Sequence, residues 1–188
     1  MPDKRVTPVE HVIALVDEIC ASNNLGYAII GGIAATVYGS GRTTIDVDLI
    51  VQTDIPTLDL VYKAFAGDFA PLKEKPLEFF RQYFVLPVIH KDLHVKLDVS
   101  AALSGFEQTA LKRAKRLPYG SVSAVFCSPE DLILFKLVAN RDRDLVDVKD
   151  IVARNKQRLD LTYLRTAAAQ FREVERSDIQ ETLETLLR

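Results

Sequence analysis

The sequence predicts an α/β (α+β) fold in which a mixed sheet with helices is followed by a helical C-terminal lobe. Short apolar runs typical of strands lie before about residue 127, and segments with helical periodicity and N-cap residues follow. No glycine- or serine-rich linker separates the two halves. We therefore expect lobes at 1–127 and 128–188, packed as one unit with a cleft between them.

Composition limits the classes of protein that fit. The 188 residues are 48% hydrophobic and 27% charged, as in one compact domain or two small lobes. The formal net charge of −2 gives no general positive field that would attract nucleic acid, although a local basic patch is still compatible with the sequence. Cys20 and Cys127 lack CxxC spacing, which predicts buried, reduced thiols. Without a signal-peptide pattern or a bilayer-length apolar run, we expect a soluble cytoplasmic protein with no membrane partner.

The first predicted element is a helix that begins after Thr7. Thr7 is a favourable N-cap, Pro8 suits the first helical position, and Glu10 stands three residues after the cap. Apolar residues then recur with helical spacing as far as Cys20. This segment predicts a helix with one face packed on the sheet.

The stretch 27–38 has the pattern of a strand, a glycine turn and a short helix. Apolar residues 27–30 end at Gly31 and Gly32, and small residues follow to Tyr38. Glycine lets the backbone approach a ligand, and the first turn of a helix leaves N–H groups unpaired. This pattern is one way to build a phosphate site.

Acidic residues follow closely after this turn. Residues 39–44 are rich in turn formers and small donors, and Asp46 and Asp48 then alternate with apolar residues. In a strand such carboxylates share a face, where their repulsion favours a hard divalent cation such as Mg²⁺. A phosphate turn beside paired carboxylates predicts chemistry on a nucleoside triphosphate. The plainer alternative is a tight turn followed by a solvated strand face.

Other phosphate and nucleophile motifs do not match. Gly39 and Gly41 lack the third glycine of a dinucleotide fingerprint, no GK[ST] follows a glycine loop, and Ser40 is not in a G-x-S-x-G elbow.

The middle of the chain predicts a helix, an irregular segment and two strands. The helix spans 57–66, the prolines and charges of 68–81 suggest a loop, and strands follow at 82–90 and 93–100. Lys91-Asp92 joins the strands as a tight hairpin, and Pro87 argues for a bulge or an edge position. Asp98 then lies on the polar face of the second strand.

Two other side-chain groups have simple explanations. His90 and His94 fall short of the three or four ligands that zinc normally takes. A helix within 101–116 ends in the basic residues Lys112, Arg113, Lys115 and Arg116. These cations suit a helix C-terminus, and a contact with nucleic-acid or nucleotide phosphates is the alternative. Leu117–Gly120 then predicts a turn, and Ser121–Cys127 a last strand.

The C-terminal half begins with a helix capped by Ser128. Lys136 stands in the middle of its apolar run, and a buried lysine is costly unless its ammonium meets an anion or extends to water. The charged string 141–147, which includes Asp144 and Asp147, follows and continues into helices to residue 187.

The central stretch resembles a known family. Ile30-Gly31-Gly32, thirteen intervening residues and then Asp46-Val47-Asp48-Leu49 are similar to the nucleotidyltransferase motif of the DNA polymerase β superfamily. The fuller string GSGRTTIDVDL resembles the branch that holds AbiEii-type abortive-infection toxins and small uncharacterised nucleotidyltransferases.

This resemblance implies a nucleotidyltransferase core and a set of functional residues. Asp46 and Asp48 would bind Mg²⁺, with two metal ions expected and Mn²⁺ as an alternative, and Asp98 would complete the site and accept the proton of the attacking hydroxyl. The implied triphosphate ligands are Gly31, Gly32, Ser40, Arg42 and Lys136. Asp144 or Asp147 would bind or orient the substrate.

The implied activity is transfer of a nucleoside monophosphate from an NTP to an acceptor hydroxyl. The acceptor is open between RNA, as in a toxin that modifies tRNA beside an antitoxin partner, and a small molecule such as an antibiotic. The rival from another class is a nucleotide-binding regulatory module whose chemistry has lapsed. A purely structural interaction protein is the third alternative.

Overall fold

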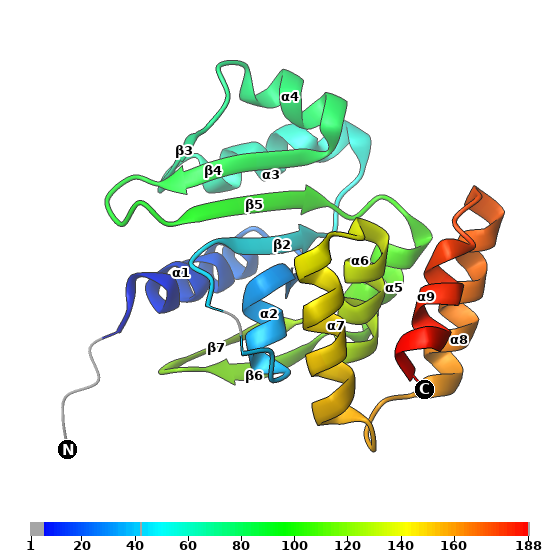
Figure 1. Cartoon of the computed structure of the whole chain (residues 1–188). Coiled ribbons are helices and arrows are strands. Elements are labelled where there is room, and N and C mark those ends of the chain that lie inside the picture. The colour runs from blue at the N-terminus through cyan, green and yellow to red at the C-terminus, as the bar shows by residue number, and fades with distance from the viewer. Residues whose placement is uncertain (1–5, 42, 188) are drawn as a thin grey trace, which may run out of the picture. The chain divides into compact units, whose positions relative to one another are not determined.

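The computed structural model describes residues 6–41 and 43–187. Its elements fall into two compact units (Figure 1). The sheet unit contains the residues up to Ile33 together with Thr44–Cys127, and the helical unit contains Ala34–Thr43 together with the residues from Ser128 onward. The mixed α/β fold is confirmed.

The sheet unit is built on a seven-stranded sheet within the described residues, in the order β3-β4-β5-β2-β1-β7-β6 (Figure 1). The strands are β1 (Tyr27–Ile30), β2 (Val47–Val51), β3 (Phe69–Pro71), β4 (Val85–His90), β5 (Lys96–Ala101), β6 (Lys115–Tyr119) and β7 (Val122–Phe126). The pairs β1/β7 and β2/β5 are parallel, and the other pairs are antiparallel. The sheet is therefore mixed, as the sequence predicts.

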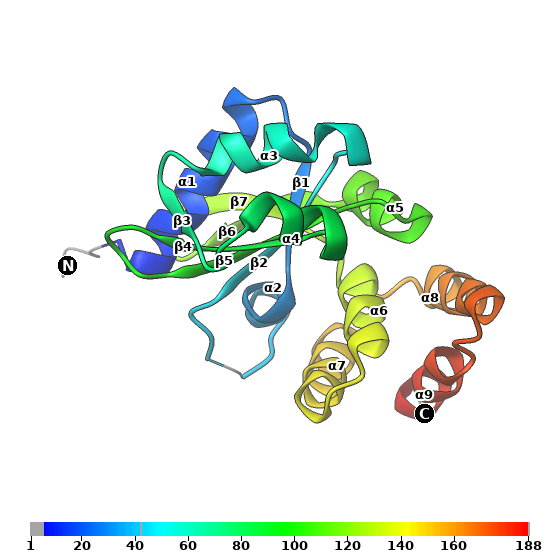
Figure 2. The ribbon, with the colours of Figure 1, turned by 90° about the horizontal axis from the view of Figure 1, so that it is seen from above.

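Helices pack against this sheet. They are α1 (Pro8–Ser22), the short 3-10 turn η1 (Ile55–Thr57), α3 (Leu58–Phe65), α4 (Pro76–Tyr83) and α5 (Gly105–Arg113). Figure 2 shows α1 and α3 on the same face of the sheet. The largest fully buried side chains include Ile13, Leu49, Phe65 and Phe126, so the core lies between these helices and the strands.

The predicted start of α1 is confirmed. The Thr7 side chain accepts a hydrogen bond from the Glu10 amide, and the Glu10 carboxylate accepts one from the Thr7 amide at 2.7 Å. The same carboxylate accepts a bond from the Ser121 amide at 2.8 Å. Glu10 thus joins α1 to the turn between β6 and β7.

The predicted loop at 68–81 is wrong. Strand β3 pairs with the end of β4, and α4 begins at Pro76, the first helical position. Phe80, on α4, is fully buried. The two prolines and the charges suggested irregular structure, but proline is tolerated at a helix start and in a short edge strand.

The predicted turn at Leu117–Gly120 is also wrong in its first three residues. They belong to β6, which pairs with β7, and the turn begins at Gly120 with φ of +57°. Strand β6 lies at the edge of the sheet, where Pro118 removes no essential ladder bond.

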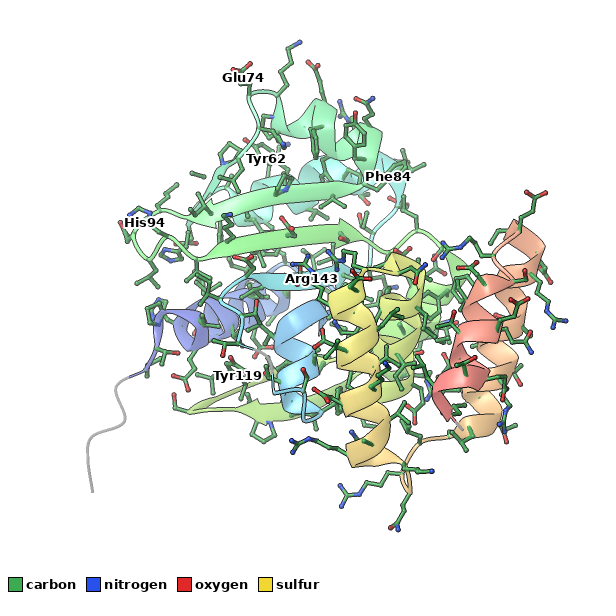
Figure 3. All side chains as sticks on the ribbon, in the orientation of Figure 1. Tyr62, Glu74, Phe84, His94, Tyr119 and Arg143 are labelled. Atoms are coloured by element: carbon green, nitrogen blue, oxygen red, sulfur yellow. The ribbon has the colours of Figure 1, made fainter. Side chains whose placement is uncertain are left out.

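The joint between β4 and β5 is longer than the predicted two-residue hairpin. His90 accepts bonds at Nδ1 from the amides of Asp92 and Leu93, and His94 has a left-handed φ of +54°. Figure 3 shows His94 in this turn. Pro87 lies one residue beyond the residues that β3 pairs with, and its carbonyl accepts a hydrogen bond of 3.0 Å from the Leu72 amide, so β4 is an inner strand and not the expected edge strand.

The helical unit contains the C-terminal helices. They are α6 (Pro129–Ala139), α7 (Asp142–Asn155), α8 (Leu161–Gln170), the 3-10 turn η2 (Phe171–Val174) and α9 (Asp178–Leu187). Ser128 caps α6 by accepting a bond from the Asp131 amide, as predicted. The short helix α2 (Gly31–Val37) begins at the end of β1 and runs into this unit.

Candidate active site

Three aspartates meet at one end of the paired strands β2 and β5. Asp48 is in direct register with Asp98 on the parallel neighbour. Adjacent strands are about 4.8 Å apart, and registered residues of a parallel pair point to the same face. Asp46 precedes β2 by one residue, so it lies just outside the strand in which it was predicted. The structure therefore places Asp48 and Asp98 side by side on neighbouring strands, with Asp46 two residues before Asp48.

The charges of these aspartates influence one another. Partial desolvation and then the negative charge of Asp46 raise the pKa of Asp98, while Lys96 acts in the opposite direction. Asp98 nevertheless keeps an exposed surface.

Gly31 supports this cluster by lacking a side chain. Its φ is +66°, a left-handed conformation that favours glycine. A Cβ at this position would lie 2.7 Å from the carboxyl carbon of Asp48. The backbone of Gly31 and the carboxylate of Asp48 are therefore in direct contact. Gly32 is buried in the first turn of α2.

The kinds of side chain present decide whether a metal ion could bind near the aspartates. Among residues 6–41 and 43–187, no group of three or more His, Cys, Asp or Glu side chains is arranged to hold a metal ion. The aspartate cluster nevertheless supplies only carboxylate oxygens, the ligand type that Mg²⁺ prefers.

A second polar group is buried inside the helical unit. Lys136 on α6 places its ammonium 2.6 Å from Asp147 and 3.3 Å from Asp144, both on α7. Ser40 donates a hydrogen bond of 2.7 Å to the other oxygen of Asp147. Lys136 is 3% exposed and each aspartate 1%. The anions that meet this buried lysine are thus protein carboxylates.

The charges of this network balance. Burial alone would raise the pKa of Asp144, but hydrogen bonding from Arg141 and the charge of Lys136 outweigh it and lower the pKa. The Arg141 guanidinium lies 2.5 Å from Asp144. Lys136 and Arg141 both face Asp144, and Lys136 also faces Asp147, so each of these buried carboxylates has a cation beside it.

The same helix holds the loop after α2. The Gly41 amide donates to Asp150 at 3.5 Å, and Asn155 donates to the Tyr38 carbonyl at 2.9 Å. Gly39 has φ of +99°, and a Cβ there would meet the Arg154 side chain. The loop that contains Ser40 is therefore attached to α7 at several points. Arg42 lies outside the described residues.

The predicted residues thus form two groups within separate units. Asp46, Asp48, Asp98, Gly31 and Gly32 gather in the sheet unit, and Ser40, Lys136, Asp144 and Asp147 gather in the helical unit. The sequence missed that the aspartates of α7 pair with Lys136. Their spacing of three residues, which places both on one side of a helix, was the available signal.

A mixed sheet with a glycine turn beside carboxylates of two neighbouring strands defines a nucleotidyltransferase fold. The chain belongs to the family described as "Nucleotidyltransferase of unknown function (DUF6036)", whose model matches residues 9–185. No curated protein sequence matches the chain.

Solved structures with the same fold support this assignment. An antigenic nucleotidyltransferase-like protein from Paracoccidioides brasiliensis is 22% identical, with a TM-score of 0.54 over 94% of this chain and 92% of its own. The antibiotic-resistance factor ANT(2'')-Ia is 14% identical, with a TM-score of 0.58 over 89% and 94%. The lincosamide antibiotic adenylyltransferase LnuA, bound to lincomycin, is 13% identical, with a TM-score of 0.51 over 76% and 95%.

At these identities the likeness establishes the fold alone, and the AbiEii-type branch stays a prediction. A helix that crosses a bilayer needs about 20 apolar residues. In the parts of the chain that the structure describes, no helix has the length and hydropathy for that.

Proposed function

We propose that this protein is a magnesium-dependent enzyme that transfers a nucleoside monophosphate from an NTP to an acceptor hydroxyl, releasing pyrophosphate. The observation that carries the proposal is the meeting of Asp46, Asp48 and Asp98 beside the turn at Gly31. Membership of a nucleotidyltransferase family supports it.

The carboxylates fit the divalent ions that this chemistry requires. Partial desolvation and then the charge of Asp46 raise the pKa of Asp98, which supports a concentration of negative charge at this end of the strands. Oxygen donors of this kind suit Mg²⁺, and Mn²⁺ accepts the same ligands. Two bound ions would supply electrostatic stabilisation to the attacking and leaving oxygens.

The side chains of the sheet unit have separate roles in the proposal. Asp46 and Asp48 would hold the metal ions, and Asp98 would also accept the proton of the acceptor hydroxyl. The backbone N–H groups at Gly31 and Gly32 would bind the triphosphate. Nucleotide contacts by Ser40, Arg42 and Lys136 and substrate orientation by Asp144 or Asp147 stay predictions.

Within this activity, one observation favours a small-molecule acceptor over RNA. Arg116, part of the predicted basic patch, is held by Asp17 at 2.8 Å, so its charge is already paired. This pairing occupies one of the four cations that an RNA backbone would contact. Antibiotics are candidates because two proteins of the same fold are an antibiotic adenylyltransferase and an antibiotic-resistance factor.

Transfer assays with labelled substrates test the proposal. The protein is incubated with each α-labelled NTP, Mg²⁺ and one of three acceptor sets, namely total tRNA, an antibiotic panel or a metabolite extract. We expect transfer by the wild type and a loss of at least about a hundredfold in Asp48→Asn, because a metal ligand and its charge are removed. Asp92→Asn, an exposed aspartate in the β4–β5 turn, is the matched control.

The outcomes separate the proposal from its rivals. Absence of transfer in every mixture, or an equally active Asp48→Asn protein, refutes the enzyme. Thermal stabilisation by an NTP without any transfer would instead indicate a regulatory nucleotide-binding module. Labelling of tRNA, with growth inhibition relieved by a neighbouring gene product, would support the toxin role and its antitoxin partner.

A further inference from the structure

A separate cavity lies at the other end of the central strands. It has a volume of about 720 Å³ and is bordered by Gly26, which precedes β1, and Gln52, which follows β2. Gly26 and Gly31 are at opposite ends of β1. With a rise of about 3.3 Å per residue, they are about 16 Å apart, so this cavity is distinct from the aspartate cluster.

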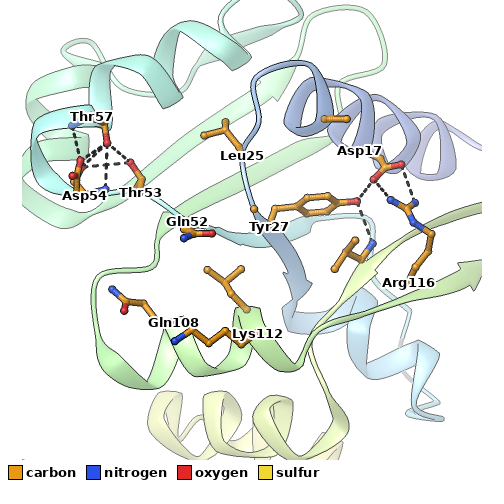
Figure 4. Close-up of a pocket in the computed structure, with 14 residues that line it drawn as sticks. Asp17, Leu25, Tyr27, Gln52, Thr53, Asp54, Thr57, Gln108, Lys112 and Arg116 are labelled. Atoms are coloured by element: carbon orange, nitrogen blue, oxygen red, sulfur yellow. Dashed lines mark hydrogen bonds and ion pairs between the residues drawn. The ribbon is translucent and has the colours of Figure 1, made fainter.

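The cavity combines an apolar surface with a polar rim, as Figure 4 shows. The apolar part is formed by Ala21, Leu25, Leu111 and Val125. Small-molecule sites in proteins have volumes of about 300–1,000 Å³ and combine apolar walls with a few polar groups. The size and the lining of this cavity are therefore those of a ligand site.

Several charged groups of the rim are already paired. Asp17 binds both terminal nitrogens of Arg116, at 2.8 and 2.9 Å, and accepts a bond from the Tyr27 hydroxyl at 2.7 Å. Asp54 accepts bonds from the amide and the hydroxyl of Thr57. These side chains shape the cavity while their own charges are satisfied.

Three other side chains of the rim are not paired in this way. Gln108 and Lys112 are four residues apart on α5 and thus on one side of the helix, and Gln52 faces them from the end of β2 (Figure 4). Within residues 6–41 and 43–187, none of the three side chains has a hydrogen bond or an ion pair. Their polar atoms are available to a ligand.

Gly26 leaves room for the side-chain carboxamide of Gln52 beside its backbone. A Cβ on Gly26 would lie 2.7 Å from Oε1 of Gln52. The carboxamide can therefore lie over the backbone of Gly26 only because that residue has no side chain.

We propose that this cavity binds a nucleoside monophosphate at a site distinct from the site of nucleotidyl transfer. Each glutamine carboxamide offers a donor beside an acceptor, which matches the edge of a nucleobase. The ammonium of Lys112 is the cation of the rim that no carboxylate holds, and it suits one phosphate group. Because the site lies across the sheet unit from the aspartates, its ligand would be separate from the nucleotide that is transferred.

Calorimetric titration with the four nucleoside 5′-monophosphates tests this site. The titrations contain EDTA, so that metal-dependent binding at the aspartate cluster does not contribute. We expect binding by the wild-type protein, and a loss of about tenfold or more in Lys112→Glu, since a hydrogen bond to a charged group has about that effect. Ribose 5-phosphate, which lacks the base, should bind about tenfold more weakly than the best monophosphate.

Two control variants separate this site from the proposed enzyme. Lys115→Glu changes an exposed lysine of β6 that does not line the cavity, and Asp46→Asn changes the aspartate cluster. Both should bind the monophosphate as the wild type does. Absence of binding at millimolar ligand, unchanged affinity in Lys112→Glu, or equal affinity for ribose 5-phosphate would overturn the proposal, whether or not the protein transfers nucleotides.

Discussion

Replacing Lys136 by methionine should destabilise the helical unit strongly. Methionine keeps most of the apolar stem but removes the ammonium that lies 2.6 Å from Asp147 and 3.3 Å from Asp144. Asp144 keeps Arg141 as a partner, and Asp147 keeps the hydrogen bond from the Ser40 hydroxyl. The variant therefore removes the 2.6 Å ion pair of a buried carboxylate.

The size of the effect follows from burial. The side chains of the Lys136–Asp147 pair are 4% and 2% exposed, so solvent screens their charges little. Removing one partner of such a pair costs about 3–5 kcal/mol. Domains are stable by about 5–15 kcal/mol, so the loss should be a large fraction of the total. Lys149→Met, an exposed lysine on α7, should change stability by less than about 0.5 kcal/mol.

Urea unfolding followed by far-ultraviolet circular dichroism measures these differences. The double variant Lys136→Met/Asp147→Asn should recover part of the loss, because it removes the carboxylate charge that Lys136 faces in the wild type. A cost below about 1 kcal/mol for Lys136→Met would refute the pairing as a source of stability. Full stability combined with a loss of NTP affinity would instead show that Lys136 serves the triphosphate.

Three further predictions concern the sheet unit. Gly31→Ala should reduce nucleotidyl transfer at least about tenfold, because a Cβ would displace the Asp48 carboxylate and strain a left-handed backbone, and an unchanged rate would contradict that contact. Hydrogen bonds from the amides of Thr7 and, to a smaller extent, Ser121 lower the pKa of Glu10. The contribution of Glu10 to stability is therefore present above its unfolded pKa, and it is lost as the pH falls through the lower pKa of the folded state. Glu10→Gln should therefore cost about 1 kcal/mol in urea unfolding at pH 7 and much less near pH 2, and an equal cost at both would refute this linkage. Burial raises the pKa of Cys20 to about 12, so its thiol should react with a thiol reagent only after unfolding, and rapid labelling of the native protein at pH 8 would contradict the burial.

The sequence was sufficient where local interactions determine structure. The capping box of Thr7 and Glu10 predicts the start of α1 because both partners lie within one helical turn. The alternation around Asp48 and Asp98 places both on strands, since side-chain direction in a strand follows position alone. These two cases need no knowledge of tertiary contacts.

Prediction failed where a distant partner decides the outcome. Pro118 suggested a turn, but β6 forms because β7 pairs with it at a sheet edge. Arg116 was expected among cations at a helix C-terminus, yet it lies on β6 and pairs with Asp17, which is 99 residues away. The pairing of Lys136 with Asp144 and Asp147 could not be predicted either, because it depends on how α6 packs against α7.

The register between β2 and β5 connects the interior of the sheet to its chemistry. Leu97 and Val99, the neighbours of Asp98, are completely buried. Sliding β5 by a single residue would turn both of them out to water and replace Asp98, opposite Asp48, with an aliphatic side chain. The hydrophobic interior therefore determines how the two carboxylates align, and sequence changes that loosen it would misalign them before the protein unfolds.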